Sequence, residues 1–370
     1  MFPFILIFSL LFVNAVLAAP TTQSIRRTQL SFTERSPQSN IDVLLARLQI
    51  DLSKHFKPKD AQTTRTLWQY DLSQQKFDLV VPPSYNRNTP HGLFIWLGNC
   101  PVSDDWLNIL AAHQLIYVSP VDGHNRVTAV QAGLALDAVH NLRKRFTVNK
   151  ERVYVAGFSA GAQRAAWVLR AYPEIFRGGV FMMGGWFYIT DVHRDGWWWD
   201  QHKVETDGEY SPYAIGLDPQ WRGPLDRLKT QISIVLVRAE ADDWFGSNIK
   251  SERAQYEGLR LDGFTRAHYI EIPGSDHVPP NPETFAKAVA ALQAAPIAPP
   301  TTAPTKSATL HPDQLAQAQR LLTTAQRGLN MHNLLQKLIR DYPASPLTPI
   351  AQRGLDWVNR EEHKPARSRR

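Results

Sequence analysis

The chain has 370 residues, 43% of them hydrophobic, which is enough for one large α/β domain and a smaller unit. Part of its formal net charge of +7 lies in a basic tail at residues 361–370. A solvated end is the simpler interpretation of this tail, tethering to an acidic surface is the alternative, and no nucleic-acid partner is expected. The single cysteine, Cys100, excludes an internal disulfide bond and a cysteine-rich metal site.

The N-terminal segment resembles a secretory signal peptide. The run Phe2–Leu17 is almost wholly apolar, and cleavage is expected at the small residues Ala18 and Ala19 that follow it. We therefore predict a signal peptide over residues 1–19 and a secreted or periplasmic protein. An uncleaved segment that anchors the chain in a membrane is the alternative, although the run is short for a full span. Residues 20–38 are polar and are predicted to form a linker.

Residues 39–293 alternate between strand and helix patterns, as expected for a catalytic α/β domain. An amphipathic helix is predicted from Ile41 to Leu52, and an antiparallel pair of strands over 67–70 and 77–81. Further strands are predicted over 93–97, 115–118, 153–156, 180–183, 232–237 and 269–272, and helices over 128–145, 162–172 and 282–292. This alternation predicts a doubly wound, mainly parallel sheet that is covered by helices on both faces.

The stretch Gly157–Gly161 reads Gly-Phe-Ser-Ala-Gly and lies between an apolar strand and the start of a helix. This G-x-S-x-G pattern places a serine on a sharp turn, and its glycines allow strand and helix to approach closely. The helix N-terminus adds positive partial charge where an oxyanion would develop. Ser159 is therefore the candidate nucleophile, and the backbone N–H of Ala160 is a candidate oxyanion-hole donor. An ordinary serine in a glycine-rich turn is the alternative.

A nucleophilic serine needs a histidine base and an acid that orients the histidine. In the doubly wound hydrolase layout, the acid and then the histidine follow the serine in the chain, each on a loop after a strand. The next-to-last predicted strand is followed by Asp242, with Asp243 as a rival, and the last is followed by His277. We therefore predict a triad of Ser159, Asp242 and His277. No histidine pair has the spacing of metal ligands, so neither a metal nor a cofactor is expected.

An insertion rich in aromatic residues separates the predicted strands over 180–183 and 232–237. We interpret its tryptophans and tyrosines as a groove or lid that binds sugar rings, aryl groups or polyester chains. A satellite core of the insertion is the alternative. Trp186 and Trp244, together with Asn99, are the candidate substrate contacts.

The C-terminal part is predicted to be a separate, smaller unit. Residues 294–312 are rich in Pro, Ala and Thr, which is typical of a semi-extended linker. Helical patterns over 314–328, 331–340 and 350–358 then predict a small helical appendage at 313–360. This appendage either docks a protein or a surface, or caps the catalytic domain.

Several motifs together resemble the α/β-hydrolase esterases, and in particular the polyhydroxybutyrate depolymerase and feruloyl esterase branch. They are Val81–Tyr85, Leu97–Cys100, Gly157–Gly161, Asp242 and His277. The resemblance covers about residues 66–292 and implies an α/β-hydrolase fold, with the aromatic-rich insertion within it and the helical appendage outside it.

The resemblance also implies a second oxyanion donor on the turn after the strand over 93–97. Carrying the family's role to this turn gives the N–H of Cys100, with Asn99 as the runner-up. Members of that branch usually have Leu-His-Gly here, whereas this chain has Gly98-Asn99 in place of His-Gly. Asparagine tolerates positive φ better than most residues, so it can follow the backbone that glycine adopts.

These patterns lead to the hypothesis of a secreted serine hydrolase that cleaves carboxylic esters through an acyl-enzyme intermediate. Its substrate would be a polymeric or an aryl ester. A serine peptidase of the same fold is one alternative. A non-catalytic protein that binds glycan or polymer on a hydrolase scaffold is the other.

Overall fold

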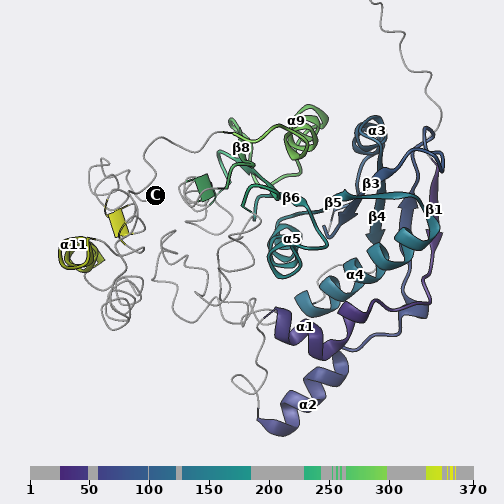
Figure 1. The fold of residues 1–370 in the computed structure, drawn as a ribbon, viewed down its shortest axis with the longest axis horizontal. Coiled ribbons are helices and arrows are strands. Elements are labelled where there is room, and N and C mark those ends of the chain that lie inside the picture. Colours follow the sequence, from purple (N-terminus) through teal and green to yellow (C-terminus); the bar gives the residue numbers. More distant parts are fainter. Residues whose placement is uncertain are drawn as a thin grey trace, which may run out of the picture.

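The structure is a computed structural model of the 370-residue chain (Figure 1). It describes residues 26–48, 57–98, 100–121, 127–184, 229–242, 252, 256, 259–260, 264–297, 331–343, 348, 351–352 and 355. The predicted signal peptide, most of the aromatic insertion, most of the Pro-rich linker and the basic tail lie outside these residues. The division of the chain into domains therefore stays a prediction.

The described elements follow one another as strands and helices. The strands are β1 (Arg27–Leu30), β2 (Phe77–Val80), β3 (His91–Trp96), β4 (Leu115–Pro120), β5 (Val148–Phe158), β6 (Gly178–Met182), β7 (Ser233–Ala239) and β8 (Ala267–Ile272). The α-helices are α1 (Ile41–Arg47), α2 (Pro58–Leu67), α3 (Asp104–Ala112), α4 (Thr128–Arg145), α5 (Ala160–Ala171), α9 (Pro282–Leu292) and α11 (Met331–Asp341). Short 3₁₀ helices occur at Pro37–Ser39 and Leu72–Gln74. Within the described residues, no helix is both long and apolar enough to cross a membrane.

The strands form one eight-stranded sheet in the order β1-β2-β4-β3-β5-β6-β7-β8. Among them β2 runs against the others, since it pairs antiparallel with both β1 and β4, whereas the pairs from β4 to β8 are parallel. The prediction of a doubly wound, mainly parallel sheet is confirmed.

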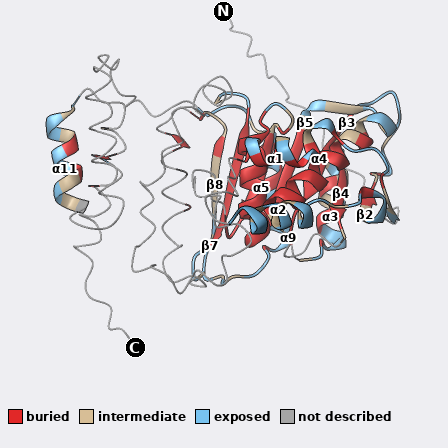
Figure 2. Ribbon diagram, turned by 90° about the horizontal axis from the view of Figure 1, so that it is seen from below, coloured by how far each residue is buried: buried red, intermediate tan, exposed pale blue. Residues whose placement is uncertain are grey.

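Helices cover both faces of the sheet because alternate residues of each strand point to opposite sides. In β3, Ile95 belongs to the hydrophobic cluster beneath α1, α4 and α5, and Trp96 belongs to the cluster beneath α3 and α9. On the second face the rings of Trp106 (α3) and Phe285 (α9) stack with their centroids 4.0 Å apart. Burial is concentrated in the central strands and the helices that cover them, as Figure 2 shows.

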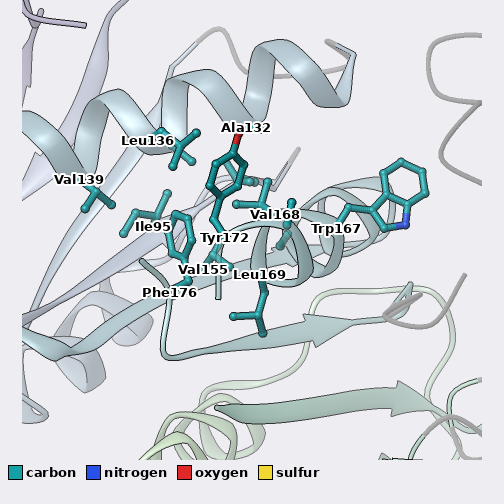
Figure 3. Close-up of a cluster of buried hydrophobic side chains, with 14 of the residues drawn as sticks. Ile95, Ala132, Leu136, Val139, Val155, Trp167, Val168, Leu169, Tyr172 and Phe176 are labelled. Atoms are coloured by element: carbon teal, nitrogen blue, oxygen red, sulfur yellow. The ribbon is translucent and has the colours of Figure 1, made fainter. Parts of the chain in front are cut away.

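The layer formed by α4 and α5 packs tightly on the centre of the sheet (Figure 3). Leu136 and Val139 of α4 lie over Ile95 of β3, and the ring of Tyr172 extends from the end of α5 toward α4. Helix α4 is buried over most of its length, which explains why its sequence carries few charges before Arg143. This layer fixes the direction of α5, which begins directly after the candidate nucleophile Ser159.

Several sequence predictions need correction. The segment over 67–70 is not a strand, because α2 extends to Leu67 and Trp68 caps its C-terminus. The polar segment over 20–38 is not entirely a linker, since Arg27–Leu30 form the edge strand β1. The helix α3 was not predicted at all. The helices predicted over 128–145 and 282–292 are confirmed with the same bounds.

Candidate active site

The predicted site residues lie at the carboxyl ends of the parallel strands. The chain passes from β3 through α3 to β4 on one side, and from β5 through α5 to β6 on the other. The neighbours β3 and β5 thus form a topological switch point, which is the place at the strand ends where ligands bind in open α/β sheets. Ser159 directly follows β5, and the turn of Gly98 and Cys100 follows β3.

Ser159 occupies a strained backbone position between a strand and a helix. Strand β5 ends at Phe158 and α5 begins at Ala160, so one residue makes the entire turn. Its φ of 54° and ψ of −126° lie outside the favoured regions for a side-chain-bearing residue, which costs on the order of 1–3 kcal/mol. A hydrogen bond from the Ser159 N–H to the Met182 carbonyl oxygen, 2.8 Å long, holds this turn against β6.

The two glycines of the motif are required by close backbone approaches. A Cβ atom at Gly157 would lie 2.4 Å from the carbonyl of Gly161, within the turn itself. A Cβ atom at Gly161 would lie 2.2 Å from the Leu97 carbonyl oxygen, where α5 passes the end of β3. These contacts explain why the pattern has glycine at both positions. Gly157 leaves room for the first turn of α5, and Gly161 leaves room for the end of β3.

The structure brings Ser159, His277 and Asp242 together in one chain of hydrogen bonds. His277 Nε2 lies 2.9 Å from Ser159 Oγ, and His277 Nδ1 lies 2.7 Å from Asp242 Oδ2. Because the carboxylate can only accept, the neutral imidazole that fits this chain carries its proton on Nδ1. Its Nε2 then accepts from the serine hydroxyl, which is the arrangement of a general base beside a nucleophile.

The loops that carry the acid and the base brace each other. The Ala241 N–H donates to the Ser275 carbonyl oxygen at 2.8 Å, and the Gly274 N–H donates to Glu240 Oε2 at 2.9 Å. The Asp242 and His277 side chains are 15% and 11% exposed, so both are shielded but not sealed from solvent. The ring of Phe158, at the end of β5, has its centroid 5.0 Å from that of the His277 ring. This contact limits the movement of the imidazole.

The predicted oxyanion donors lie at the expected elements. Ala160 is the first residue of α5, where the backbone N–H has no acceptor within the helix. The turn after β3 passes close to α5, since a Cβ at Gly161 would lie 2.7 Å from the Gly98 α-carbon. Cys100 is held at this turn by a hydrogen bond from Trp96 Nε1 to its carbonyl oxygen, 3.0 Å long. Its role as the second donor stays a prediction.

The Cys100 side chain is no rival to Ser159 as a nucleophile. Burial raises the pKa of its thiol to about 11, whereas the nucleophilic form of cysteine is the thiolate. At neutral pH the group is therefore a protonated, half-buried thiol. The role proposed for Cys100 is therefore that of its backbone N–H.

Other predicted site residues fall outside the described part of the chain. They are Asn99, Trp186, Asp243 and Trp244. Within the described ranges, no group of three or more His, Cys, Asp or Glu side chains is arranged to hold a metal ion. Sequence reasoning missed Glu252, a buried carboxylate that accepts a hydrogen bond from the Gly184 N–H beside Ser159. No sequence signal marks it, because its partner lies 68 positions earlier.

The sheet order, the covering helices and the sharp turn at Ser159 define an α/β-hydrolase fold. No protein-family model matches the sequence, and no curated protein matches it either.

Solved structures resemble the chain distantly. The S-formylglutathione hydrolase FrmB from Staphylococcus aureus matches with 11% identity and a TM-score of 0.43, over 72% of this chain and 96% of its own. The feruloyl esterase module from Clostridium thermocellum matches with 12% identity and a TM-score of 0.43, over 74% of this chain and 87% of its own. The match spans only 58% of a thermostable esterase, and 36% of a puromycin-hydrolysing peptidase from Mycobacterium tuberculosis. Likenesses this distant carry no information on the substrate.

Proposed function

We propose that this protein is a secreted serine hydrolase that cleaves carboxylic esters. The observation that carries the proposal is the hydrogen-bonded chain from Ser159 Oγ through His277 to Asp242, with distances of 2.9 and 2.7 Å. It stands at the carboxyl ends of three strands, on the turn geometry that a nucleophilic serine needs. A fully structural role for these residues would not require a strained serine whose hydroxyl faces an oriented imidazole.

In the proposed reaction, Ser159 Oγ attacks the ester carbonyl carbon while His277 Nε2 takes the hydroxyl proton. The carbonyl oxygen becomes an oxyanion that the N–H groups of Ala160 and Cys100 would stabilise. When the tetrahedral intermediate collapses, His277 returns the proton to the leaving alcohol. Water then attacks the acyl-enzyme by the same route and releases the acid. Asp242 keeps the imidazole in the required tautomer throughout.

Replacing Ser159 by alanine tests the proposal. The Ser159→Ala variant should lose hydrolysis of p-nitrophenyl acetate and covalent labelling by a fluorophosphonate, because no oxygen remains to form the bond. Ser73→Ala is the matched control, since Ser73 is exposed and bonds only to its own turn. Hydrolysis at the wild-type rate in Ser159→Ala, with the control also active, would refute the assignment.

The ester preference needs its own measurement. The ratio of kcat/KM for an acyl ester to that for the matched anilide should strongly favour the ester, and faster amide cleavage would instead support a peptidase. A panel of short acyl, feruloyl and polyester substrates would then test whether the aromatic insertion, including Trp186 and Trp244, favours aryl or polymeric esters. Sequencing the N-terminus of the exported protein would test the proposed signal cleavage after residue 18 or 19.

A further inference from the structure

The chain leaves β6 through a strained turn that packs on the nucleophile. Met183 has a φ of 50° although it is not a glycine, and its side chain is buried. Such a backbone conformation persists only where the surroundings hold it. The Met183 N–H donates to the Val237 carbonyl oxygen of β7 at 2.9 Å, which fixes one side of this turn.

Gly184, the next residue, lies directly against the peptide group that joins Ser159 to Ala160. A Cβ atom at Gly184 would be 2.4 Å from the Ser159 carbonyl oxygen and 3.0 Å from its carbonyl carbon. The same peptide group carries the Ala160 N–H, the first donor of the proposed oxyanion hole. The position of Gly184 therefore limits how this peptide can tilt.

Glu252 fixes the other side of the turn. Its Oε1 accepts a hydrogen bond from the Gly184 N–H at 2.6 Å, and the side chain is only 5% exposed. A hydrogen bond from a backbone N–H to a carboxylate is short and strong. This bond therefore holds the Gly184 backbone in place against the Ser159–Ala160 peptide.

We propose that Glu252 is a positioning residue for the oxyanion hole: through its hydrogen bond to Gly184 it holds the exit of β6 against the Ser159–Ala160 peptide and so aims the Ala160 N–H at the reacting oxygen. The inference rests on the proposed hydrolase function and adds a residue outside the triad. Its effect belongs to the transition state, because the oxyanion exists only after attack.

The expected size of the effect follows from the donor that Glu252 positions. Complete removal of one oxyanion donor lowers kcat by about 10²–10³-fold, and a misplacement of about 1 Å can cost about 10²-fold. The loss of kcat caused by a tilted Ala160 N–H should lie between no loss and the loss caused by complete removal of the donor. We therefore expect a loss of roughly 10- to 100-fold in kcat, with KM changed by less than about threefold.

Two conservative variants separate the hydrogen bond from the charge. Glu252→Gln keeps the length of the side chain and a carbonyl oxygen that can accept from Gly184, but it removes the charge. Glu252→Asp keeps the charge but is one methylene shorter, so it cannot reach the Gly184 N–H at 2.6 Å without moving the backbone. The Gln variant should stay within about threefold of the wild-type kcat, and the Asp variant should show the loss.

The measurement is kcat and KM for p-nitrophenyl acetate, with kcat expressed per active site titrated by a fluorophosphonate, so that unfolded protein does not count. The inhibition constant of a trifluoromethyl ketone adds a direct readout. Its ketone carbon forms a bond to Ser159 Oγ, and the proton of the serine hydroxyl passes to His277. The former ketone oxygen is then an oxyanion in the same hole. In Glu252→Asp its Ki should rise by the same factor by which kcat/KM falls.

Asp137→Asn is the matched control, since Asp137 is a fully buried carboxylate that accepts from the Ser36 N–H at 2.6 Å, on α4 rather than at the turn. It should change the thermal midpoint and leave kcat per titrated site intact. A wild-type kcat in Glu252→Asp, or an equal loss in Gln and Asp, would overturn the inference. Residual turnover in Ser159→Ala would instead overturn the proposed function, so the two failures are distinguishable.

Discussion

In the proposed reaction Asp242 acts through His277, since its Oδ2 lies 2.7 Å from the imidazole Nδ1. The carboxylate selects the tautomer in which Nε2 is free to accept the Ser159 proton. In the proposed reaction it would also stabilise the imidazolium that forms during the attack. Asp243 is the next residue in the sequence and has the same side chain, and the hydrogen bond to His277 is the observation that favours Asp242.

The exchange of each aspartate for asparagine tests this assignment at the residue scale. In Asp242→Asn the side-chain amide would favour the wrong tautomer, and kcat should fall by about 10⁴-fold while the fold stays intact. Asp243→Asn should remain within about threefold of the wild type. Steady-state kinetics on p-nitrophenyl acetate distinguishes the two variants. A large loss in Asp243→Asn with an active Asp242→Asn would reverse the assignment.

At the scale of elements, the junction of β5 and α5 depends on the end of β3. The Leu97 N–H donates to the Ala156 carbonyl oxygen at 2.8 Å, so the exit of β3 is part of the sheet beside β5. Gly161, in the first turn of α5, lies against the Leu97 carbonyl oxygen. The nucleophile turn and the proposed oxyanion turn therefore cannot move independently, and a side chain between them would separate both.

Gly161→Ala should destabilise the protein because the new methyl group would collide with the Leu97 carbonyl oxygen, just after β3. This backbone group cannot shift without a cost in free energy. Overpacking of this kind costs about 3 kcal/mol in the free energy of unfolding. Gly274→Ala is the control: that site has open space around it and a φ of 62°, so only the backbone conformation is strained, at about 1 kcal/mol. Urea unfolding measures both. An equal or smaller loss in Gly161→Ala would contradict the close contact.

Elements with a long hydrophobic pattern were predicted correctly, whereas two helices that begin at a local cap or an N-terminal proline were missed. Long apolar patterns in the sequence predict the buried helices over 128–145 and 282–292. The segment over 67–70 alternates like a strand, but Pro58 at the first turn begins a helix that runs into it. The helix α3 was overlooked although Ser103 accepts from the Trp106 N–H at 3.3 Å, a cap that its sequence could have revealed.

The candidate site divides in the same way. Ser159, Asp242 and His277 could be predicted because each occupies a fixed place after a strand in a known layout. Glu252 could not, because its value depends on a contact with Gly184 that only the folded chain creates. Side chains that act by holding backbone leave no local pattern. Such side chains can be identified only when the folded structure shows which backbone groups they contact.

At the scale of the whole molecule, the segment of residues 26–48 belongs to the body that carries the site. Beyond β1, it is fastened to α4 by Asp137, whose carboxylate accepts from the Ser36 N–H and the Ser39 hydroxyl at 2.6 Å each. The Tyr70 hydroxyl, from the chain after α2, donates to the other oxygen at 2.6 Å. The buried Asp137 carboxylate thus connects helix α4 with the segment of Ser36 and Ser39 and with the segment of Tyr70.

Asp137 makes a distinctive contribution to the dependence of stability on pH. Burial raises the pKa of its carboxyl above the ordinary value of 3.8, against the opposing effect of the hydrogen bonds from Ser39, Tyr70 and the Ser36 N–H and of the nearby Arg35 charge. In the window between 3.8 and the raised pKa, the folded state holds the proton more tightly than the unfolded chain does. The contribution of this proton is therefore complete below 3.8 and is lost as pH rises through the folded pKa.

Comparison of the wild type with Asp137→Asn isolates this contribution, because asparagine does not titrate. The free energy of unfolding of the wild type minus that of the variant should decrease as pH rises from about 3.5, with a slope of at most about 1.4 kcal/mol per pH unit. Above the folded pKa of Asp137 the difference should become constant. Urea titrations at half-unit intervals up to pH 7 measure it. An increase of the difference with pH would mean that the hydrogen bonds outweigh burial and that the carboxylate is stabilised in its charged form.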